Sequence, residues 1–315
     1  MTAFTPIVTG SFVALITPMN GDFSIDYPGF ATLLDFQREA GTSAVLIMGS
    51  SGEVSMLSPD ERHTIVRETM KHKNGGMQHW YGCTGSTTEA TIDYVRQAAD
   101  EGADGAVIAA PNYICAPNAD ITRFFLDVAD ASPIPLGVYN NPPRVKTDLG
   151  VEDILTLARH PNIAVLKEST ARVGQVGQVC AAEPDVAVMC CCSPNLGLVV
   201  PTMSLGGHGT ANMTGNIIPR EMVEISTPWG DDGDRALRFR AAYLRNLPML
   251  HFVYSAINPV PVKSLMRAVG MPAGPLRRPL SGLDGQALAR GLEIVRSLGL
   301  DTAYGYRTDP VLAAE

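Results

Sequence analysis

Long hydrophobic runs and clusters of basic charge are both missing from this sequence. No apolar run reaches the 18 or so residues that a membrane-spanning helix needs, and residues 1–10 lack the basic and apolar segments of a secretory signal. Charged residues make up 18% of the 315 residues, are dispersed along the chain, and sum to a net charge of −8. Nucleic-acid binding needs a clustered basic surface. The sequence therefore predicts a cytoplasmic protein that binds neither a membrane nor nucleic acid.

Recognisable metal-ligand and disulfide patterns are missing as well. The six cysteines are Cys83, Cys115, Cys180, Cys190, Cys191 and Cys192. None of them forms a Cys-x-x-Cys pair or a Cys/His pair at ligand spacing. Consecutive residues on a strand point to opposite faces, so the triplet at 190–192 makes a poor metal site, and disulfides seldom persist in the cytosol. We expect these cysteines to be small core residues and expect no metal site.

What the sequence does contain is a regular alternation of apolar, β-rich runs with helical segments. The expected strands are Val13–Pro18, Ala44–Gly49, His79–Gly85, Gly105–Pro111, Ile134–Asn140, Ile163–Glu168, Val186–Cys192 and Gly209–Met213. The expected helices between them include Asp26–Ala40, Pro59–Lys71, Thr87–Glu101, Ala119–Ala131, Val151–Arg159 and Arg172–Ala182. Continuous apolar strands are buried on both faces, which is typical of parallel strands covered by helices. Eight repeats of about 25 to 30 residues favour an α/β fold closed as a TIM (β/α)8 barrel. A dinucleotide fold fits poorly, because no Gly-x-Gly-x-x-Gly motif follows the first strand.

The last part of the chain predicts a helical C-terminal region. We assign residues 1–230 to the barrel and residues 231–315 to helices that pack on it. Helices are expected at Asp234–Ala256, Pro259–Ala268 and Gly285–Leu298, separated by turns rich in proline and glycine. The tail Thr302–Glu315 is expected to be loosely ordered.

A lysine and a tyrosine end two successive predicted strands. Lys167 closes the run Ile163–Glu168, and Tyr139 closes the run before it. In barrels of this kind the reactive groups lie at the carboxyl ends of the strands. A desolvated lysine loses its charge near neutral pH, and a neutral amine attacks a ketone to form an imine. A neighbouring phenol can transfer the protons. The alternatives are an ion pair of Lys167 with Glu168 or with another acid at a strand end, and a core tyrosine whose hydroxyl is satisfied.

Other predicted strand ends contribute polar groups. The turn at residues 49–52 presents backbone N–H groups that suit a carboxylate, and its Ser51 is a candidate proton relay. Arg144, in a loop stiffened by two prolines, offers a bidentate fork for a second carboxylate. His208 is a further candidate for substrate contact, since the glycines around it, including Gly207, permit close backbone approach. An ordinary serine turn and a surface arginine are the alternatives.

Four stretches together give the chain a resemblance to the dihydrodipicolinate synthase / N-acetylneuraminate lyase family of pyruvate-dependent class I aldolases. They are Gly49-Ser50-Ser51-Gly52-Glu53, Tyr139-Asn140-Asn141-Pro142, Lys167-Glu168-Ser169-Thr170 and Gly206-Gly207-His208-Gly209-Thr210-Ala211-Asn212. The resemblance runs from about Gly10 to Leu298. It implies a TIM-barrel lyase that forms an imine between Lys167 and pyruvate, or another 2-oxo acid, and needs no separate cofactor. It also implies an aldehyde as second substrate and a homotetramer built as a dimer of dimers.

The same resemblance implies roles for individual residues. Tyr139 matches the tyrosine that shuttles protons. Ser50 and Ser51 match the hydroxyl pair that grips the pyruvate carboxylate and relays protons. Tyr113 matches a tyrosine that is lent across the tight dimer interface, and Arg144 matches the arginine that grips the carboxylate of the aldehyde.

Two departures from the family pattern leave other reactions open. Gly207 and His208 replace a bulkier aliphatic pocket wall, and the segment Val54–Pro59 lacks the histidines that line the lysine feedback site of regulated members. The leading prediction is an aldol-type lyase. The alternatives are a Schiff-base dehydratase or deaminase of a 2-oxo sugar acid or cyclic imino acid, and a non-catalytic sugar-acid binder.

Overall fold

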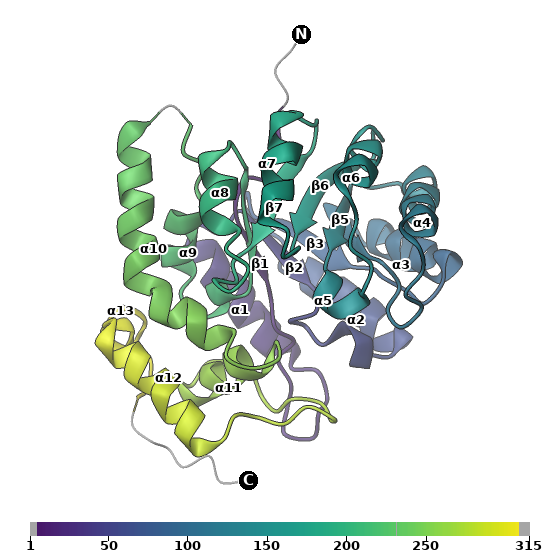
Figure 1. The fold of residues 1–315 in the computed structure, drawn as a ribbon. Coiled ribbons are helices and arrows are strands. Elements are labelled where there is room, and N and C mark those ends of the chain that lie inside the picture. Colours follow the sequence, from purple (N-terminus) through teal and green to yellow (C-terminus); the bar gives the residue numbers. More distant parts are fainter. Residues whose placement is uncertain (1–4, 231, 309–315) are drawn as a thin grey trace.

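The computed structural model describes residues 5–230 and 232–308. Eight parallel strands close into a barrel in sequence order, with β1 paired to β8 (Figure 1). The strands are β1 (Gly10–Ala14), β2 (Ala44–Ile47), β3 (Gln78–Gly82), β4 (Gly105–Ala109), β5 (Leu136–Asn140), β6 (Ile163–Glu168), β7 (Ala187–Cys191) and β8 (Gly209–Asn212). All eight predicted strands are confirmed, and with them the predicted (β/α)8 barrel.

The first strand lies earlier in the chain than its apolar run predicts. The run Val13–Pro18 is hydrophobic from its start, but the ladder covers Gly10–Ala14, where β1 pairs with β2 and β8. Beyond this strand the N–H of Ile16 donates to the side chain of Asn216 at 3.1 Å. The difference arises because hydrophobicity reports burial, which here continues past the point where strand pairing ends.

Alternate side chains of the strands fill the barrel, and the others pack beneath the helices. The interior cluster consists of Val8, Phe12, Ala14, Ala44, Leu46, Trp80, Val107, Val165, Ala187, Met189 and Ala211. Tyr139 packs against this cluster. Burial on both faces accounts for the continuous apolar character of the strands.

Six of the helices between strands match their predicted bounds to within one residue at each end. These are α1 (Tyr27–Glu39), α2 (Pro59–Met70), α3 (Thr88–Asp100), α4 (Asn118–Ala131), α6 (Val151–Ala158) and α7 (Val173–Ala181). Helix α2 begins at a capping box, in which Ser58 accepts from the N–H of Glu61 and the Glu61 carboxylate accepts from the N–H of Ser58.

Five short elements within residues 5–230 were not predicted: η1 (Val54–Met56), α5 (Pro142–Val145), α8 (Val199–Ser204), η2 (Thr214–Asn216) and α9 (Pro219–Ser226). Each spans eight residues or fewer. A helical repeat needs a window of about 11 residues or more to register in the sequence. These elements are therefore too short for periodicity to reveal them.

The C-terminal helices lie on one side of the barrel, with the first of them, α10, next to α9 (Figure 1). They are α10 (Gly233–Val253), α11 (Val260–Ala268), α12 (Gly285–Ser297) and α13 (Leu300–Tyr304). Their buried side chains, such as Phe239 and Leu265, belong to the same apolar cluster as the outer faces of the strands. The three predicted helices are confirmed, although α10 ends three residues before its predicted end at Ala256. The domain boundary after residue 230 stays a prediction, because residue 231 lies outside the described residues.

The expectation of a loosely ordered tail is wrong for residues 302–308. The helix α13 continues to Tyr304, and Tyr306 is buried with its hydroxyl donating to the carbonyl oxygen of Ile217 at 2.6 Å. The sequence gives little sign of this, because a five-residue helix and one anchoring tyrosine produce no periodic pattern. Residues 309–315 of the predicted tail lie outside the described residues.

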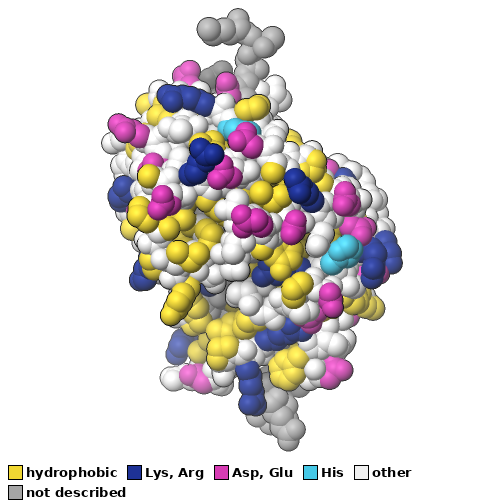
Figure 2. Space-filling model, turned by 90° about the vertical axis from the view of Figure 1, so that its right-hand side faces the viewer, with side chains coloured by type: hydrophobic (Ala, Val, Ile, Leu, Met, Phe, Trp, Pro, Cys, Tyr) yellow, Lys and Arg dark blue, Asp and Glu magenta, His cyan; other side chains and the backbone are white. Residues whose placement is uncertain are grey.

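Charges of both signs are interspersed on the face of the molecule shown in Figure 2. Oppositely charged side chains also pair along helices: Arg123 and Asp127 of α4 form an ion pair at 2.7 Å. Across residues 5–230 and 232–308, no helix combines the length and the apolar character that crossing a membrane requires.

Candidate active site

Lys167 lies at the carboxyl end of β6 with its side chain inside the barrel. Strand pairing places it between Tyr139 of β5 and Met189 of β7, and only 3% of the residue is exposed. Its amine nitrogen lies 4.0 Å from the centre of the Tyr139 ring. Burial lowers the pKa of Lys167 to about 8, an effect that the thiols of Cys191 and Cys192 partly offset. Part of the amine is therefore neutral near physiological pH.

Glu168 points to the other side of β6 and is not the partner of Lys167. Its carboxylate accepts hydrogen bonds from Asn140 Nδ2 at 2.9 Å, the N–H of Thr170 at 2.7 Å and Gln175 Nε2 at 3.3 Å. Burial raises the pKa of Glu168 to about 7, and these hydrogen bonds act in the opposite direction. The alternative of a Lys167–Glu168 ion pair is therefore wrong. Within the described part of the chain, Lys167 has no acidic partner within ion-pair distance.

Tyr139 is the last residue but one of β5 and lines a cavity at the mouth of the barrel. Burial raises the pKa of its phenol well above the usual value, while the hydroxyls of Ser169 and Ser50 act in the opposite direction. The phenol therefore stays protonated at neutral pH. Ser50 lines the same cavity, whereas Ser51 is 1% exposed and does not line it. The hydroxyl of this turn that acts on Tyr139 is thus that of Ser50, whereas the sequence predicts Ser51, because consecutive side chains of a tight turn point in different directions.

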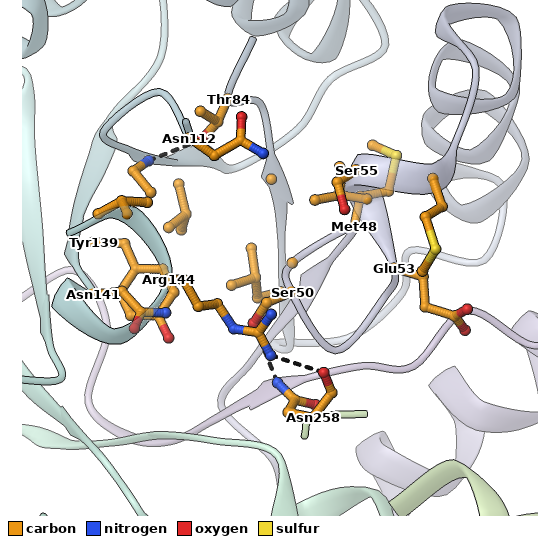
Figure 3. A pocket seen from close by; sticks show the side chains of 18 of the residues that line it. Met48, Ser50, Glu53, Ser55, Thr84, Asn112, Tyr139, Asn141, Arg144 and Asn258 are labelled. Atoms are coloured by element: carbon orange, nitrogen blue, oxygen red, sulfur yellow. Dashed lines mark hydrogen bonds between the residues drawn. The ribbon is translucent and has the colours of Figure 1, made fainter. Parts of the chain in front are cut away.

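Arg144 reaches the same cavity from the short helix α5. Figure 3 shows it beside Asn258 and Ser50: Arg144 Nη2 donates to the carbonyl oxygen of Asn258 at 2.8 Å, and Asn258 Nδ2 donates to Ser50 Oγ at 3.3 Å. The side-chain oxygen of Asn258 is buried and accepts no hydrogen bond from the described residues. The cavity has a volume of about 710 Å³, enough for two small organic acids together. The guanidinium is exposed at its rim, so it is free to bind a carboxylate.

A buried ion pair anchors the serine turn to the C-terminal helices. Glu53 follows the turn in a left-handed backbone conformation, with φ 56°. Its carboxylate accepts from Lys263 Nζ of α11 at 2.5 Å and from the N–H of Arg277 at 2.9 Å. Neither side chain of the pair has exposed surface. Burial lowers the pKa of Lys263, and Glu53 acts against that effect. Sequence reasoning did not find this pair, because its members are 210 residues apart.

Gly207 and His208 are not part of this site, contrary to the prediction. They precede β8, which begins at Gly209, and so lie at the amino end of the barrel. His208 Nδ1 accepts from the N–H of Val188, near the start of β7, at 3.0 Å, and its carbonyl oxygen accepts from the N–H of Gly10 at 2.7 Å. A Cβ on Gly207 would lie 2.3 Å from the side chain of Thr202, which accounts for glycine there. The prediction failed because it placed the glycine-rich stretch around His208 at the carboxyl end of the last strand, whereas these residues precede the strand.

Tyr113 lies outside the cavity of its own chain. It follows β4 in a loop with φ 75° and is 97% exposed. Its neighbour Asn112 lines the cavity, but Tyr113 does not. The structure therefore brings together Lys167, Tyr139, Ser50 and Arg144. Tyr113 lies apart from these groups, exposed on the surface of the chain.

Tyr139, Ser50 and Arg144 bring a protonated phenol, a neighbouring hydroxyl and an exposed guanidinium to one cavity. Lys167 does not line this cavity, but its amine of lowered pKa lies 4.0 Å from the centre of the Tyr139 ring. That combination suits imine chemistry on an acidic substrate. No group of three or more His, Cys, Asp or Glu in the described ranges is placed to hold a metal ion.

Comparisons with known proteins agree with this geometry. The 4-hydroxy-tetrahydrodipicolinate synthase of Ralstonia nicotianae is 31% identical over 89% of this chain and 94% of its own. The enzyme of the same name from Gluconacetobacter diazotrophicus is 32% identical over 94% of this chain and 99% of its own. Among solved structures, the chloride-inhibited dihydrodipicolinate synthase from Acinetobacter baumannii complexed with pyruvate superposes with a TM-score of 0.86. It is 27% identical and covers 92% of this chain and 99% of its own. The sequence profile of the dihydrodipicolinate synthetase family matches residues 7–296, and the chain belongs to that family.

Proposed function

We propose that this protein is a lyase that joins pyruvate, or another 2-oxo acid, to an aldehyde through an imine on Lys167. One observation carries the proposal: a buried amine with a pKa lowered to about 8 lies 4.0 Å from the centre of a tyrosine ring at the carboxyl mouth of a barrel. A neutral amine is the nucleophile that imine formation needs. The imine is itself the covalent intermediate, so the proposed reaction uses no further cofactor.

The reaction begins with attack of the neutral Lys167 amine on C2 of the keto acid. The nitrogen gives up one proton and the carbonyl oxygen takes one, which yields a carbinolamine. The nitrogen lone pair then expels this oxygen as water, with a proton from the phenol of Tyr139, and leaves a protonated imine. Tyr139 suits this transfer because its raised pKa keeps it protonated, and the Ser50 hydroxyl beside it extends the proton path.

Carbon–carbon bond formation follows from the imine. Loss of a proton from C3 gives an enamine, and C3 then attacks the aldehyde carbon, whose oxygen takes a proton and becomes a hydroxyl. One water hydrolyses the product imine and returns the free amine of Lys167. The positive imine nitrogen accepts the electron pair left at C3, which is the reason for forming the imine first.

Two parts of the cavity suit two carboxylates. Backbone N–H groups of the turn around Ser50 and Ser51 suit the carboxylate of the keto acid. Arg144 suits a carboxylate on the aldehyde, because its guanidinium is exposed at the rim of the cavity. We therefore expect the second substrate to be an acidic aldehyde.

The named relatives support this reaction over the alternatives. Both curated relatives are 4-hydroxy-tetrahydrodipicolinate synthases, and the Acinetobacter baumannii enzyme is complexed with pyruvate. This favours pyruvate as the keto acid. It also favours aldol-type condensation over dehydration or deamination of a sugar acid, and over binding without catalysis.

A homotetramer in the cytoplasm completes the proposal. Tyr113, 97% exposed at the mouth of the barrel, is suited to reach the site of a second copy. Exposed apolar side chains on α8, at its C-terminal end and on α10 offer a second contact; they are Val200, Leu205, Leu237 and Leu244. All six cysteines are free thiols, as expected in a reducing compartment. Sedimentation velocity measures the oligomeric state. The variant Tyr113→Phe should lower turnover and leave the oligomeric state unchanged.

Reductive trapping tests the central claim. Incubation with pyruvate and sodium borohydride should give one covalent adduct per chain, mapped by mass spectrometry to the peptide that contains Lys167. The variant Lys167→Ala should give none. A panel of aldehydes with and without a carboxylate then identifies the second substrate. No adduct on Lys167 with any 2-oxo acid would contradict the proposal, and release of water or ammonia without a new carbon–carbon bond would replace it with the dehydratase or deaminase.

A further inference from the structure

The end of β7 carries three consecutive cysteines in three different environments. Cys190 is 1% exposed and faces Thr202 of α8, and Cys192 is fully buried with its Sγ 3.3 Å from Thr214 Oγ1. Cys191 is the most exposed of the three, at 9%. Side chains of a strand alternate, and both Ala187 and Met189 belong to the interior cluster. Cys191 therefore points into the barrel mouth, whereas its two neighbours point toward the helices.

Cys191 and Tyr139 stand on either side of Lys167. The strand order is β5, β6, β7, and Lys167 on β6 pairs with Tyr139 on one side and Met189 on the other. Cys191 lies two residues beyond Met189 toward the carboxyl end, so its thiol is one layer above the lysine on the neighbouring strand. Among charged or ionisable neighbours, Cys191 has the largest effect on the pKa of both Lys167 and Tyr139. The amine, the phenol and this thiol thus form one cluster.

Tyr254 holds the thiol in place from the end of α10. Its hydroxyl lies 3.1 Å from Cys191 Sγ and 3.3 Å from Cys192 Sγ. The loop that follows Tyr254 carries Asn258, which contacts Ser50 and Arg144 on the other side of the cavity. Because the Tyr254 hydroxyl contacts the thiols of both Cys191 and Cys192, the side chain of Cys191 has little freedom to change rotamer.

We infer that Cys191 is a specificity-determining residue, whose thiol forms the wall against which C3 of the imine-bound 2-oxo acid packs, with Tyr254 as the positioning residue that fixes this wall. The inference rests on the proposed function, because it needs an imine on Lys167. A keto acid attached to this amine has Tyr139 on the β5 side and the thiol on the β7 side. The thiol wall limits the C3 substituent, so the site takes pyruvate in preference to a 2-oxo acid with a longer chain.

The test compares pyruvate with 2-oxobutanoate, which carries one more methylene at C3. The measured quantity is the ratio of the two second-order rate constants for borohydride-trapped adduct formation. One methylene in a close-fitting pocket is worth about 10- to 200-fold in discrimination. Cys191→Ala should shift the ratio about tenfold toward 2-oxobutanoate, and Cys191→Val, which enlarges the side chain, should shift it toward pyruvate. Cys191→Ser, which keeps the size and the contact with Tyr254, should leave the wild-type ratio.

Matched variants separate this role from a general effect on folding. Cys190→Ala makes the same change at the preceding residue, whose thiol points to the outer face of the barrel, and should leave the ratio unchanged. Tyr254→Phe should shift the ratio in the same direction as Cys191→Ala but by less, a change that a loss of stability alone would not produce. Ratios for Cys191→Ala and Cys191→Val equal to that of Cys190→Ala would overturn the inference. Absence of any adduct in the wild-type protein would instead overturn the proposed function.

Discussion

At the amino end of the barrel, Gln78 donates to the carbonyl oxygen of Ile7 and accepts from the indole of Trp80, each at 2.8 Å. His208 likewise accepts from the N–H of Val188. At the carboxyl end, Lys167 is buried without an acidic partner in the described residues. The side chains of Gln78 and His208 are thus hydrogen-bonded at the first end, where they stabilise the fold, whereas the amine of Lys167 at the second end is left available to react. Changes at the carboxyl end should therefore cost activity, and changes at the amino end should cost stability.

The largest effect is expected at the lysine. Lys167→Ala should lower turnover by about 10⁴-fold or more, because no other amine replaces the nucleophile. Its melting temperature should stay within a few degrees of the wild type, since the substitution removes a buried amine that has no charged partner. Lys71→Ala, at an exposed lysine that follows the end of α2, is the control and should change neither quantity. Equal loss of activity in both variants would contradict the specific role of Lys167 in the reaction.

The next largest effect is expected at the phenol. Tyr139→Phe should lower turnover by about 10²- to 10⁴-fold, the usual contribution of a general acid–base group. Slow adduct formation with pyruvate should persist, because the amine remains. Tyr243→Phe, at a half-buried tyrosine of α10 that stacks on Phe239, serves as the matched control. A Tyr139→Phe variant with full turnover would remove the proton-transfer role of this residue.

A smaller effect is expected from pH. The neutral amine reacts, and the pKa of Lys167 is lowered to about 8, so raising the pH through 8 increases the reactive fraction. The rate of adduct formation should rise about tenfold between pH 7 and pH 9 and then level off. Borohydride trapping at a series of pH values measures the profile. A profile still rising steeply above pH 9 would mean that the amine is as basic as an exposed lysine.

The smallest effect on activity is expected at the amino end. His208→Ala removes the acceptor of the Val188 N–H and should lower the free energy of unfolding by about 1–3 kcal/mol, with turnover per folded molecule unchanged. Denaturant unfolding measures the loss, and His72→Ala on the exposed surface is the control. A fall in turnover for His208→Ala without a loss of stability would mean that this residue affects catalysis, and that a change at the amino end of the barrel alters the site at the carboxyl end.

The sequence predicted what depends on local pattern. Eight buried strands and the longer helices follow from apolar runs and caps such as Ser58, because burial and capping leave a signature within a few residues. Lys167 and Tyr139 were found for the same reason: each ends an apolar run that had to be a strand.

Other parts of the site depend on contacts between distant residues. Asn258 contacts Ser50 across 208 positions, and Tyr254 contacts Cys191 across 63. No local pattern connects such pairs. His208 was assigned to the wrong end of the barrel because glycine-rich turns occur both before and after strands, and composition does not tell them apart. The choice between Ser50 and Ser51 depends on side-chain direction in a turn, which residue type does not fix.

The contact between Glu53 and Lys263 means that the barrel does not fold as a separate module. A chain cut after residue 230 would lose the cation that neutralises the Glu53 carboxylate and the N–H of Arg277 that donates to it. An uncompensated charge in such a place opposes folding by several kcal/mol, comparable to the whole stability of many domains. Gene fusions, circular permutations and truncations of this protein should therefore keep α11 together with the strands.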